Sequence, residues 1–148
     1  MFLAYDPATN PLNTNEWAFP LCECFHLAAL AFSIGTISMV DLRLLGAGVT
    51  ERSAAQLMRD TEVWTLLGLT VVIGSGLAIF SSDPIHYLRN GAFQFKMAGL
   101  LVAMIYNYTI HRGIARGNRS AAVTVTAACV SLALWASLVF AGVFIGFI

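Results

Sequence analysis

FPLCECFHLAALAFSIGTISMVDLRLLG, residues 19–46, decides the fold of this chain. An α-helix rises about 1.5 Å per residue, so roughly 20 apolar residues cross the hydrocarbon layer of a bilayer, which is about 30 Å thick. The stretch is long enough to do this, and its few polar side chains recur at helical spacing. We therefore expect a transmembrane helix over about 19–45.

Three further apolar stretches, at about 63–81, 91–111 and 121–147, have comparable character. The chain of 148 residues is 58% hydrophobic and only 11% charged, whereas soluble domains carry about 25% charge. Only helices and closed barrels satisfy the backbone in lipid, and no short alternating segments suggest a barrel. The sequence thus predicts an all-α, polytopic membrane four-helix bundle in residues 19–148, preceded by an outer segment in residues 1–18.

The basic residues predict the orientation of the chain. Six of the eight lie beside or between the ends of spans one and two or of spans three and four, and two lie on the other side. The six are Arg43, Arg52, Arg59, Arg112, Arg116 and Arg119, and the two are Arg89 and Lys96. Because cytoplasmic loops are rich in Lys and Arg, we expect an up-down-up-down bundle with both termini outside.

The two cytoplasmic loops have different character. TERSAAQLMRDTE, residues 50–62, is expected to form a short surface helix capped by Thr50. HRGIARGNRS, residues 111–120, is expected to be a basic turn containing two glycines.

Polar side chains of the first predicted helix fall on one face. At about 100° per residue, this stripe consists of Glu23, His26, Ser33 and Asp41. The opposite face carries the small residues Ala28, Ala31, Gly35 and Ser38, a spacing that lets membrane helices pack closely. Because lipid cannot satisfy polar groups, the stripe is expected to face the interior.

The third predicted helix has a matching stripe with Lys96, Asn107 and His111. Glu23 and Lys96 both fall in the outer leaflet, and we expect them to pair. The pair either fixes the mutual rotation of the two helices or joins His26 in a proton or metal site tuned by Lys96. Glu-x-x-His is a helical metal-ligand spacing. Glu23, His26 and Lys96 are the predicted outer polar cluster.

Two histidines are candidate ligands for a cofactor. His26 and His86 could together hold a b-type haem or a metal ion near the outer face, with one imidazole from the first helix and one from the second outer loop. The alternative is that His86 is a solvated loop residue and His26 a hydrogen-bonded interior residue.

A second polar cluster is predicted in the inner leaflet, from Asp41, Arg43, Asn107 and His111. In one interpretation Asp41 and Arg43 anchor the helix end at the head groups. In the other, Asp41 contacts Asn107 or His111 of the third helix and forms a polar centre separate from the outer cluster.

The first helix, with Glu-x-x-His ahead of VDLRLLG, resembles that of an uncharacterised bacterial family of small four-helix inner-membrane proteins. AFQFKMAGLLVAMIYNYTIH, residues 92–111, resembles the third helix of that family. The resemblance covers nearly the whole chain, although residues 141–148 lack an expected Arg-Trp pair and His86 is not a position of the family. It implies a multi-pass protein of the bacterial inner (plasma) membrane, here with periplasmic termini, and it implies no activity.

These observations predict the first of the following three functions, with the second and third as alternatives. The first is a small membrane subunit without enzymatic activity, part of a larger or homo-oligomeric assembly, whose partners are lipids and other membrane proteins or itself but no nucleic acid. The second is an electron-transfer protein with b-type haem or a metal at His26. The third is a small transporter or proton-conducting element. No Walker loop, Gly-x-Ser-x-Gly elbow or His-Glu-x-x-His motif points to an enzyme.

Overall fold

The structure, a computed structural model, describes residues 5–48, 51–117 and 119–147. Every secondary-structure element in these ranges is helical, which confirms the all-α prediction for them. Two short helices, η2 (Pro7–Thr9) and α1 (Pro11–Thr14), come first. Each begins at a side-chain cap and has proline in its first turn.

The first long helix, α2, spans Ala18–Leu44 and matches the expected first span. It ends where Gly46 adopts a positive φ of 82°, a conformation that favours glycine. The amide of Gly46 donates to the carbonyl of Arg43, and that of Ala47 to the carbonyl of Leu42. This pair of bonds is a Schellman motif, which satisfies carbonyls that the helix end leaves free.

Helix α3 spans Ala54–Ser82 and corrects the prediction of a separate surface helix before the second span. Ser53 caps it, and Gln56 completes a capping box. The residues up to Glu62 are good helix formers, so the backbone continues from the charged loop into the apolar stretch without a break. Thr50, the expected cap, lies outside the described residues.

The third predicted span is made of consecutive helical pieces. After α4 (Pro84–Arg89), α5 runs over Gly91–Tyr106, continues as the π-helix η3 (Asn107–His111) and ends as α6 (Arg112–Arg116). The expected basic turn is therefore largely helical, and the connection to the next helix begins at Gly117. The last helix, α7, spans Ala121–Phe144.

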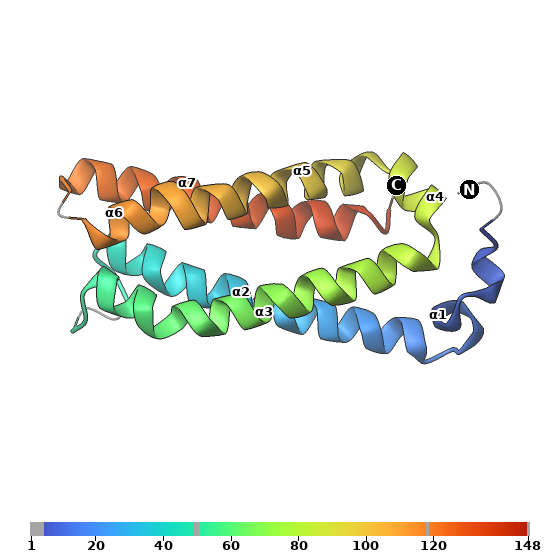
Figure 1. The fold of residues 1–148 in the computed structure, drawn as a ribbon. Helices are drawn as coiled ribbons and strands as arrows, with labels where there is room; N and C mark the ends of the chain where they lie inside the picture. Colours follow the sequence, from blue (N-terminus) through green and yellow to red (C-terminus); the bar gives the residue numbers. More distant parts are fainter. Residues whose placement is uncertain (1–4, 49–50, 118, 148) are drawn as a thin grey trace.

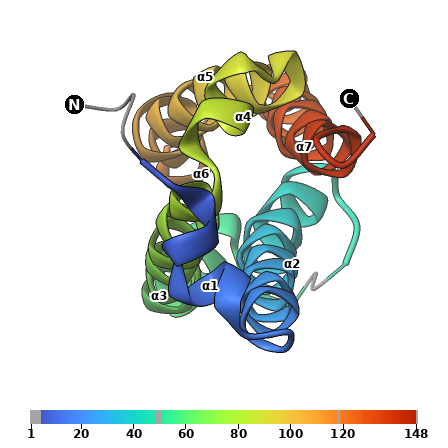
Figure 2. The same cartoon turned by 90° about the vertical axis from the view of Figure 1, so that its right-hand side faces the viewer.

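Three described helices, α2, α3 and α7, are long and apolar enough to cross a membrane, by length and composition. Together with α5, these helices pack as two pairs. Helix α2 lies along α3, α5 lies along α7, and the pairs meet through α2 with α7 and through α3 with α6 (Figures 1 and 2). Large apolar side chains also cover the outside of the molecule, as expected for a surface in lipid.

Two apolar clusters fill the interior between the pairs. The larger contains Ile37, Leu69, Ala103, Trp135 and Leu138. The smaller contains Val40, Leu57, Met58 and Ala115. The first joins all four long helical segments, and the second ties α2 and α3 to α6.

The N-terminal segment crosses the end of the molecule from α2 to α3 (Figure 2). The hydroxyl of Tyr5 and the amide of Asn10 donate to the carbonyl of Ser81, and the amide of Asn13 donates to that of Ser82 at 2.9 Å. The last carbonyls of a helix have no partner within it, so these side chains cap α3 from a distant part of the chain.

Candidate functional site

Three side chains from different helical segments meet in the interior near α6. Oδ1 of Asp41, on α2, lies 2.6 Å from Nε2 of His111, at the end of η3. The hydroxyl of Ser131, on α7, donates to Oδ2 of the same carboxylate at 2.7 Å. All three residues are 0% exposed. We call them the Asp41 cluster.

The π turn of η3 carries His111 into this cluster. Its first and last residues, Asn107 and His111, are both buried, as are Ala103 before it and Ala115 after it. A π turn is wider than an α turn and changes the rotation of the residues that follow, and such turns recur at functional sites. Here the turn keeps the buried faces of α5 and α6 directed to the same interior.

The hydrogen bonds define where the Asp41 cluster can take up a proton. When Asp41 is ionised its carboxylate only accepts, and Nε2 of His111 then donates to it. In a neutral ring the other nitrogen, Nδ1, is then an unprotonated acceptor. Nδ1 is buried without a hydrogen-bond partner among the described residues. Protonation at Nδ1 would turn the contact into an imidazolium–carboxylate ion pair.

The order of contacts differs from that of a hydrolytic triad. In a triad the histidine takes the proton of the nucleophile and the carboxylate orients the histidine. In the Asp41 cluster the carboxylate lies in the middle, and Ser131 donates to it rather than to His111. The arrangement holds a charge and a proton but does not activate a nucleophile.

A small cavity adjoins the Asp41 cluster. It has a volume of about 30 Å³. Its lining residues are Thr36, Ile37, Val40, Met58, Thr61, Glu62, Thr65, Asn107, Tyr108, His111 and Arg112. A water molecule needs about 10–15 Å³ by this measure, so the cavity has room for about two. The Tyr108 hydroxyl, like Nδ1 of His111, is buried without a partner in the described chain, and both residues line the cavity.

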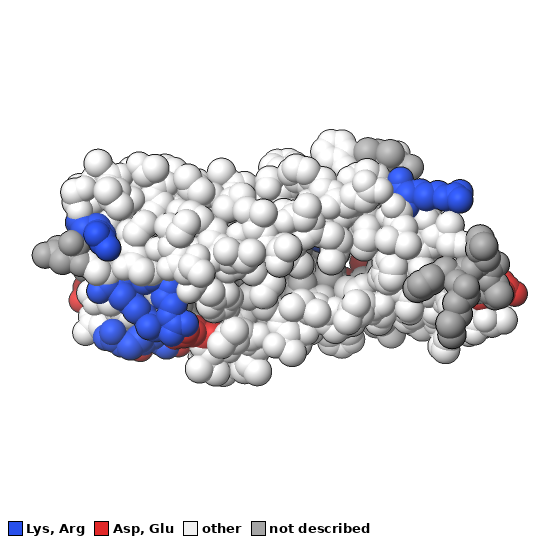
Figure 3. Space-filling view, turned by 45° about the horizontal axis from the view of Figure 1, so that its top comes forward, with Lys and Arg blue, Asp and Glu red and all other residues white. Residues whose placement is uncertain are grey.

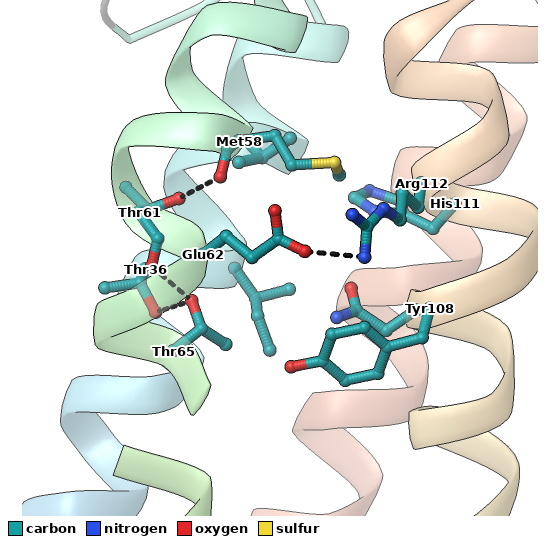
Figure 4. A pocket seen from close by; sticks show the side chains of 11 residues that line it. Thr36, Met58, Thr61, Glu62, Thr65, Tyr108, His111 and Arg112 are labelled. Carbon is teal, nitrogen blue, oxygen red and sulfur yellow. Dashed lines mark hydrogen bonds and ion pairs between the residues drawn. The ribbon is translucent and has the colours of Figure 1, made fainter. Parts of the chain in front are cut away.

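Ionic side chains close the cavity on the side of the basic loops. Glu62, on α3, reaches across to Arg112 on α6 at 2.5 Å (Figure 4). The same carboxylate lies 3.1 Å from Arg116, also on α6. The hydroxyls of Thr36 and Thr65 bond to each other at 2.8 Å on the opposite wall. Glu62 and Arg112 are less buried than the Asp41 cluster, with side chains 22% and 36% exposed.

The other half of the interior holds two residues of the predicted outer polar cluster, His26 and Lys96. Nδ1 of His26 lies 2.9 Å from the hydroxyl of Ser75, and the ring fits beside Gly76, where a Cβ would come within 3.2 Å of Cε1. Lys96 lies against Gly142 in a similar way, with its Nζ 3.2 Å from the Cβ position. Two glycines on α3 and α7 thus make room for basic side chains from α2 and α5.

The expected ion pair between Glu23 and Lys96 is absent. Among the described residues, no oxygen of Glu23 lies within the 4.0 Å of Nζ that defines an ion pair, and the Glu23 side chain is exposed. The charge of Glu23 acts instead at the end of the molecule that carries α4. Burial raises the pKa of Tyr87 on α4, a hydrogen bond from Ser82 opposes this, and the negative charge of Glu23 adds to the rise.

His86 and His26 have different surroundings. His86 is exposed on α4, with its ring 5.7 Å from that of Tyr87, whereas His26 is buried against Ser75. Within the described ranges, no group of three or more His, Cys, Asp or Glu side chains is placed to hold a metal ion. A haem between His26 and His86 stays a prediction.

Of the predicted inner cluster, the structure brings Asp41, His111 and Asn107 to one region and directs Arg43 away from it. The Nε of Arg43 donates to the backbone carbonyl of Arg52 at 2.6 Å, in the connection after α2. Arg43 therefore ties the end of α2 to the connection that follows it, and anchoring at the head groups stays a prediction.

Sequence reasoning did not assign Ser131, Glu62 or Tyr108 to a site. Ser131 had a signal, because it is a polar residue within an apolar helix. Glu62 lies among charged loop residues and Tyr108 lies between Asn107 and Thr109, so nothing in their positions distinguishes them. Their roles follow from the packing of α3 against α6.

These features define a multi-pass membrane protein of apolar helices with polar and ionisable groups in its interior. A family model described as "Family of unknown function (DUF6644)" matches residues 17–148, and the chain belongs to this family. The prediction that the chain belongs to an uncharacterised family is thereby confirmed, whereas its first-helix motif and its bacterial origin stay predictions. No curated protein and no solved structure matches the chain.

Proposed function

We propose that this protein is a four-span membrane protein that takes up and releases protons at the Asp41 cluster, as a proton-coupled transporter or proton-conducting element does. The observation that carries the proposal is the contact between Asp41 and His111, both 0% exposed, with Nδ1 of His111 free to accept a proton. Ionisable groups inside a membrane are costly and commonly mark proton relays. An imidazole has two ring nitrogens and can accept a proton at one while it donates at the other, which suits it to a relay.

In this proposal α5, η3 and α6 together form the third of four spans, and both termini lie outside. The continuous helical run from Gly91 to Arg116 supports this, because α5 alone has 16 residues while a span needs about 20. Arginines gather at the end of the molecule that carries α6 and the α2–α3 connection (Figure 3), which supports assigning that end to the cytoplasm.

Protons would reach the Asp41 cluster from the cytoplasmic side. Water in the cavity would carry a proton past Glu62 and Arg112 to Nδ1 of His111. On the other side, the apolar cluster with Trp135 and Leu138 separates His111 from the level of His26. In this conformation the cluster exchanges protons with one side, and transfer across the membrane requires the apolar cluster to open.

The proposal is tested with proteoliposomes that contain a pH-sensitive dye and carry an imposed potential from potassium and valinomycin. Wild-type vesicles should acidify faster than protein-free vesicles, and His111→Gln and Asp41→Asn should lower the rate to that of protein-free vesicles. His86→Gln is the matched control, because His86 is exposed on α4, and it should act like wild type. A wild-type rate equal to that of protein-free vesicles would sink the proposal.

A further inference from the structure

Lys96 holds a positive charge inside the outer half of the molecule. It belongs to α5, and its side chain runs along Gly142 of α7, with Nζ, Cε and Cδ 3.2, 3.7 and 4.0 Å from the position of a Cβ there. A glycine at this place is what allows the chain to turn inward. Lys96 is thus directed toward the neighbouring helix instead of lying free on the outside.

The ammonium group of Lys96 has no partner in the described part of the chain. It forms neither an ion pair nor a hydrogen bond there, whereas the cationic residues Arg52, Arg112 and Arg116 all do. Its Nζ is also not sealed off, since it is not among the fully buried unpartnered atoms. An unpaired but reachable cation at membrane depth is costly unless an anion from outside the chain joins it.

The surroundings of Lys96 favour an anion over a cation. The buried neighbour on α2 is His26, near enough for the charge of Lys96 to act on its ring. In the outer halves of α2, α3, α5 and α7 the sequence has one other charged residue, Glu23. Within the described residues Glu23 forms no ion pair with Lys96, so the ammonium group beside Gly142 is not neutralised by an ion pair there.

The molecule is hollowed on its side in this half. Figure 3 shows a recess between the pair α5–α7 and the pair α2–α3, with basic and acidic atoms visible inside and an uncharged surface around it. A recess in the flank of a membrane protein is reached from the lipid rather than through the outer water, and the N-terminal segment lies over the end (Figure 2).

We infer that this recess binds the anionic head group of a lipid from the outer leaflet, with its phosphate paired to Lys96 Nζ and its acyl chains along the apolar flank. A lipid head group and a free phosphate would both present an oxyanion to Lys96. Because the recess opens on the side of the molecule, it selects the lipid over the soluble phosphate. This inference is independent of the proton chemistry at the Asp41 cluster.

Native mass spectrometry of the detergent-purified protein tests the inference, with phosphatidylglycerol and phosphatidylcholine as probes. Wild type should retain phosphatidylglycerol in preference to phosphatidylcholine. Lys96→Met should weaken retention about tenfold, the loss expected for one charge-assisted contact. Lys96→Arg should restore it, which shows that the charge is what matters. Glu23→Gln should leave retention unchanged or strengthen it, because it removes a negative charge.

Arg89→Met is the matched control. It removes a positive charge at the same end of the molecule but from the exposed side of α4, and it should retain the lipid as wild type does. Equal retention of both lipids by wild type, or full retention by Lys96→Met, would overturn the inference. Displacement of the lipid by millimolar inorganic phosphate would show that the recess binds a soluble phosphate and not a lipid. A loss of retention in Glu23→Gln as large as in Lys96→Met would show that the bound head group is not recognised as an anion.

Discussion

Asp41 and His111 depend on each other, because in the described chain His111 has no other hydrogen-bond partner and Asp41 has only Ser131 besides. Asp41 accepts from His111 and Ser131, and His111 makes its only described hydrogen bond to Asp41. Removing one member of a buried ionic pair leaves the other unsatisfied, whereas replacing both with apolar residues is often close to neutral. The pair is thus expected to set function more than stability.

This interdependence can be measured. Asp41→Ala and His111→Ala should each lower the free energy of unfolding by about 3–5 kcal/mol. The double variant Asp41→Leu/His111→Leu should lose less than the sum of the two. Thermal unfolding in detergent, followed by circular dichroism, measures all three. Asp60→Ala, which removes an exposed pair with Arg52, should cost only about 0–1 kcal/mol and serves as control. Additive losses in the double variant would contradict the pairing.

The helical periodicity of the sequence predicted which faces carry these residues, but not which residues meet. Asp41 and His111 were expected in one inner cluster, and they lie in contact. Glu23 and Lys96 were expected to pair by the same reasoning, and they do not. A helical wheel gives the direction of a side chain but not the rotation and separation of two helices, which depend on notches such as Gly76 and Gly142.

Helices α2 and α3 pack through a different set of small residues from the one that the sequence suggested. Gly35, in the predicted seam of α2, has nothing within 4 Å of the position that a Cβ would take, and Ala28 and Ala31 are exposed. The contact is made instead by Gly68 of α3, which faces the buried Ser33. Because the polar stripe of α2 turns inward, the small-residue seam on the opposite face points outward.

Gly68 is therefore expected to be sensitive to substitution. A Cβ there would lie 2.2 Å from the hydroxyl oxygen of Ser33 and 3.4 Å from the carbonyl of Ala29. Gly68→Ala should lower the free energy of unfolding by about 1–3 kcal/mol, as overpacking does. Gly74→Ala, on the same helix but with nothing within 4 Å, is the matched control and should be neutral or slightly stabilising. Equal melting temperatures for the two variants would refute the close contact.

The ends of the helices were the least predictable part of the fold. Hydropathy locates the apolar stretches, but a helix continues for as long as the residues beyond the apolar stretch form helix. Charged residues with high helix propensity extend α3 back to Ala54, and α6 extends the third segment to Arg116. The sequence did not predict the contacts of the N-terminal segment, because they are made to α3, far along the chain.

The distribution of charge along the molecule bears on its orientation. Basic residues concentrate at one end (Figure 3), and the opposite end carries the N-terminal segment and α4. In a variant whose three native cysteines are replaced, Arg52→Cys and Arg119→Cys should react with a membrane-impermeant maleimide only after cell lysis. Glu16→Cys should react in intact cells. Labelling of Arg52→Cys and Arg119→Cys from opposite sides would contradict the four-span topology.

Composition alone was sufficient to predict a multi-pass helical membrane protein, because a chain with 11% charge cannot cover itself with polar surface. The family adds no activity to this, since its function is unknown. The proposed chemistry is therefore based on the interior of the structure. The roles of Glu62, Tyr108 and Ser131 can be assigned only when the positions of α3, η3 and α7 are known.

The wide turn at Asn107–His111 affects how relatives should be aligned with this chain. Such a turn arises from one extra residue in an otherwise regular helix. A relative without that residue would need its histidine one column earlier to reach the same aspartate. An ungapped alignment would then record the histidine as lost when it has only shifted, so the gap belongs inside residues 107–111.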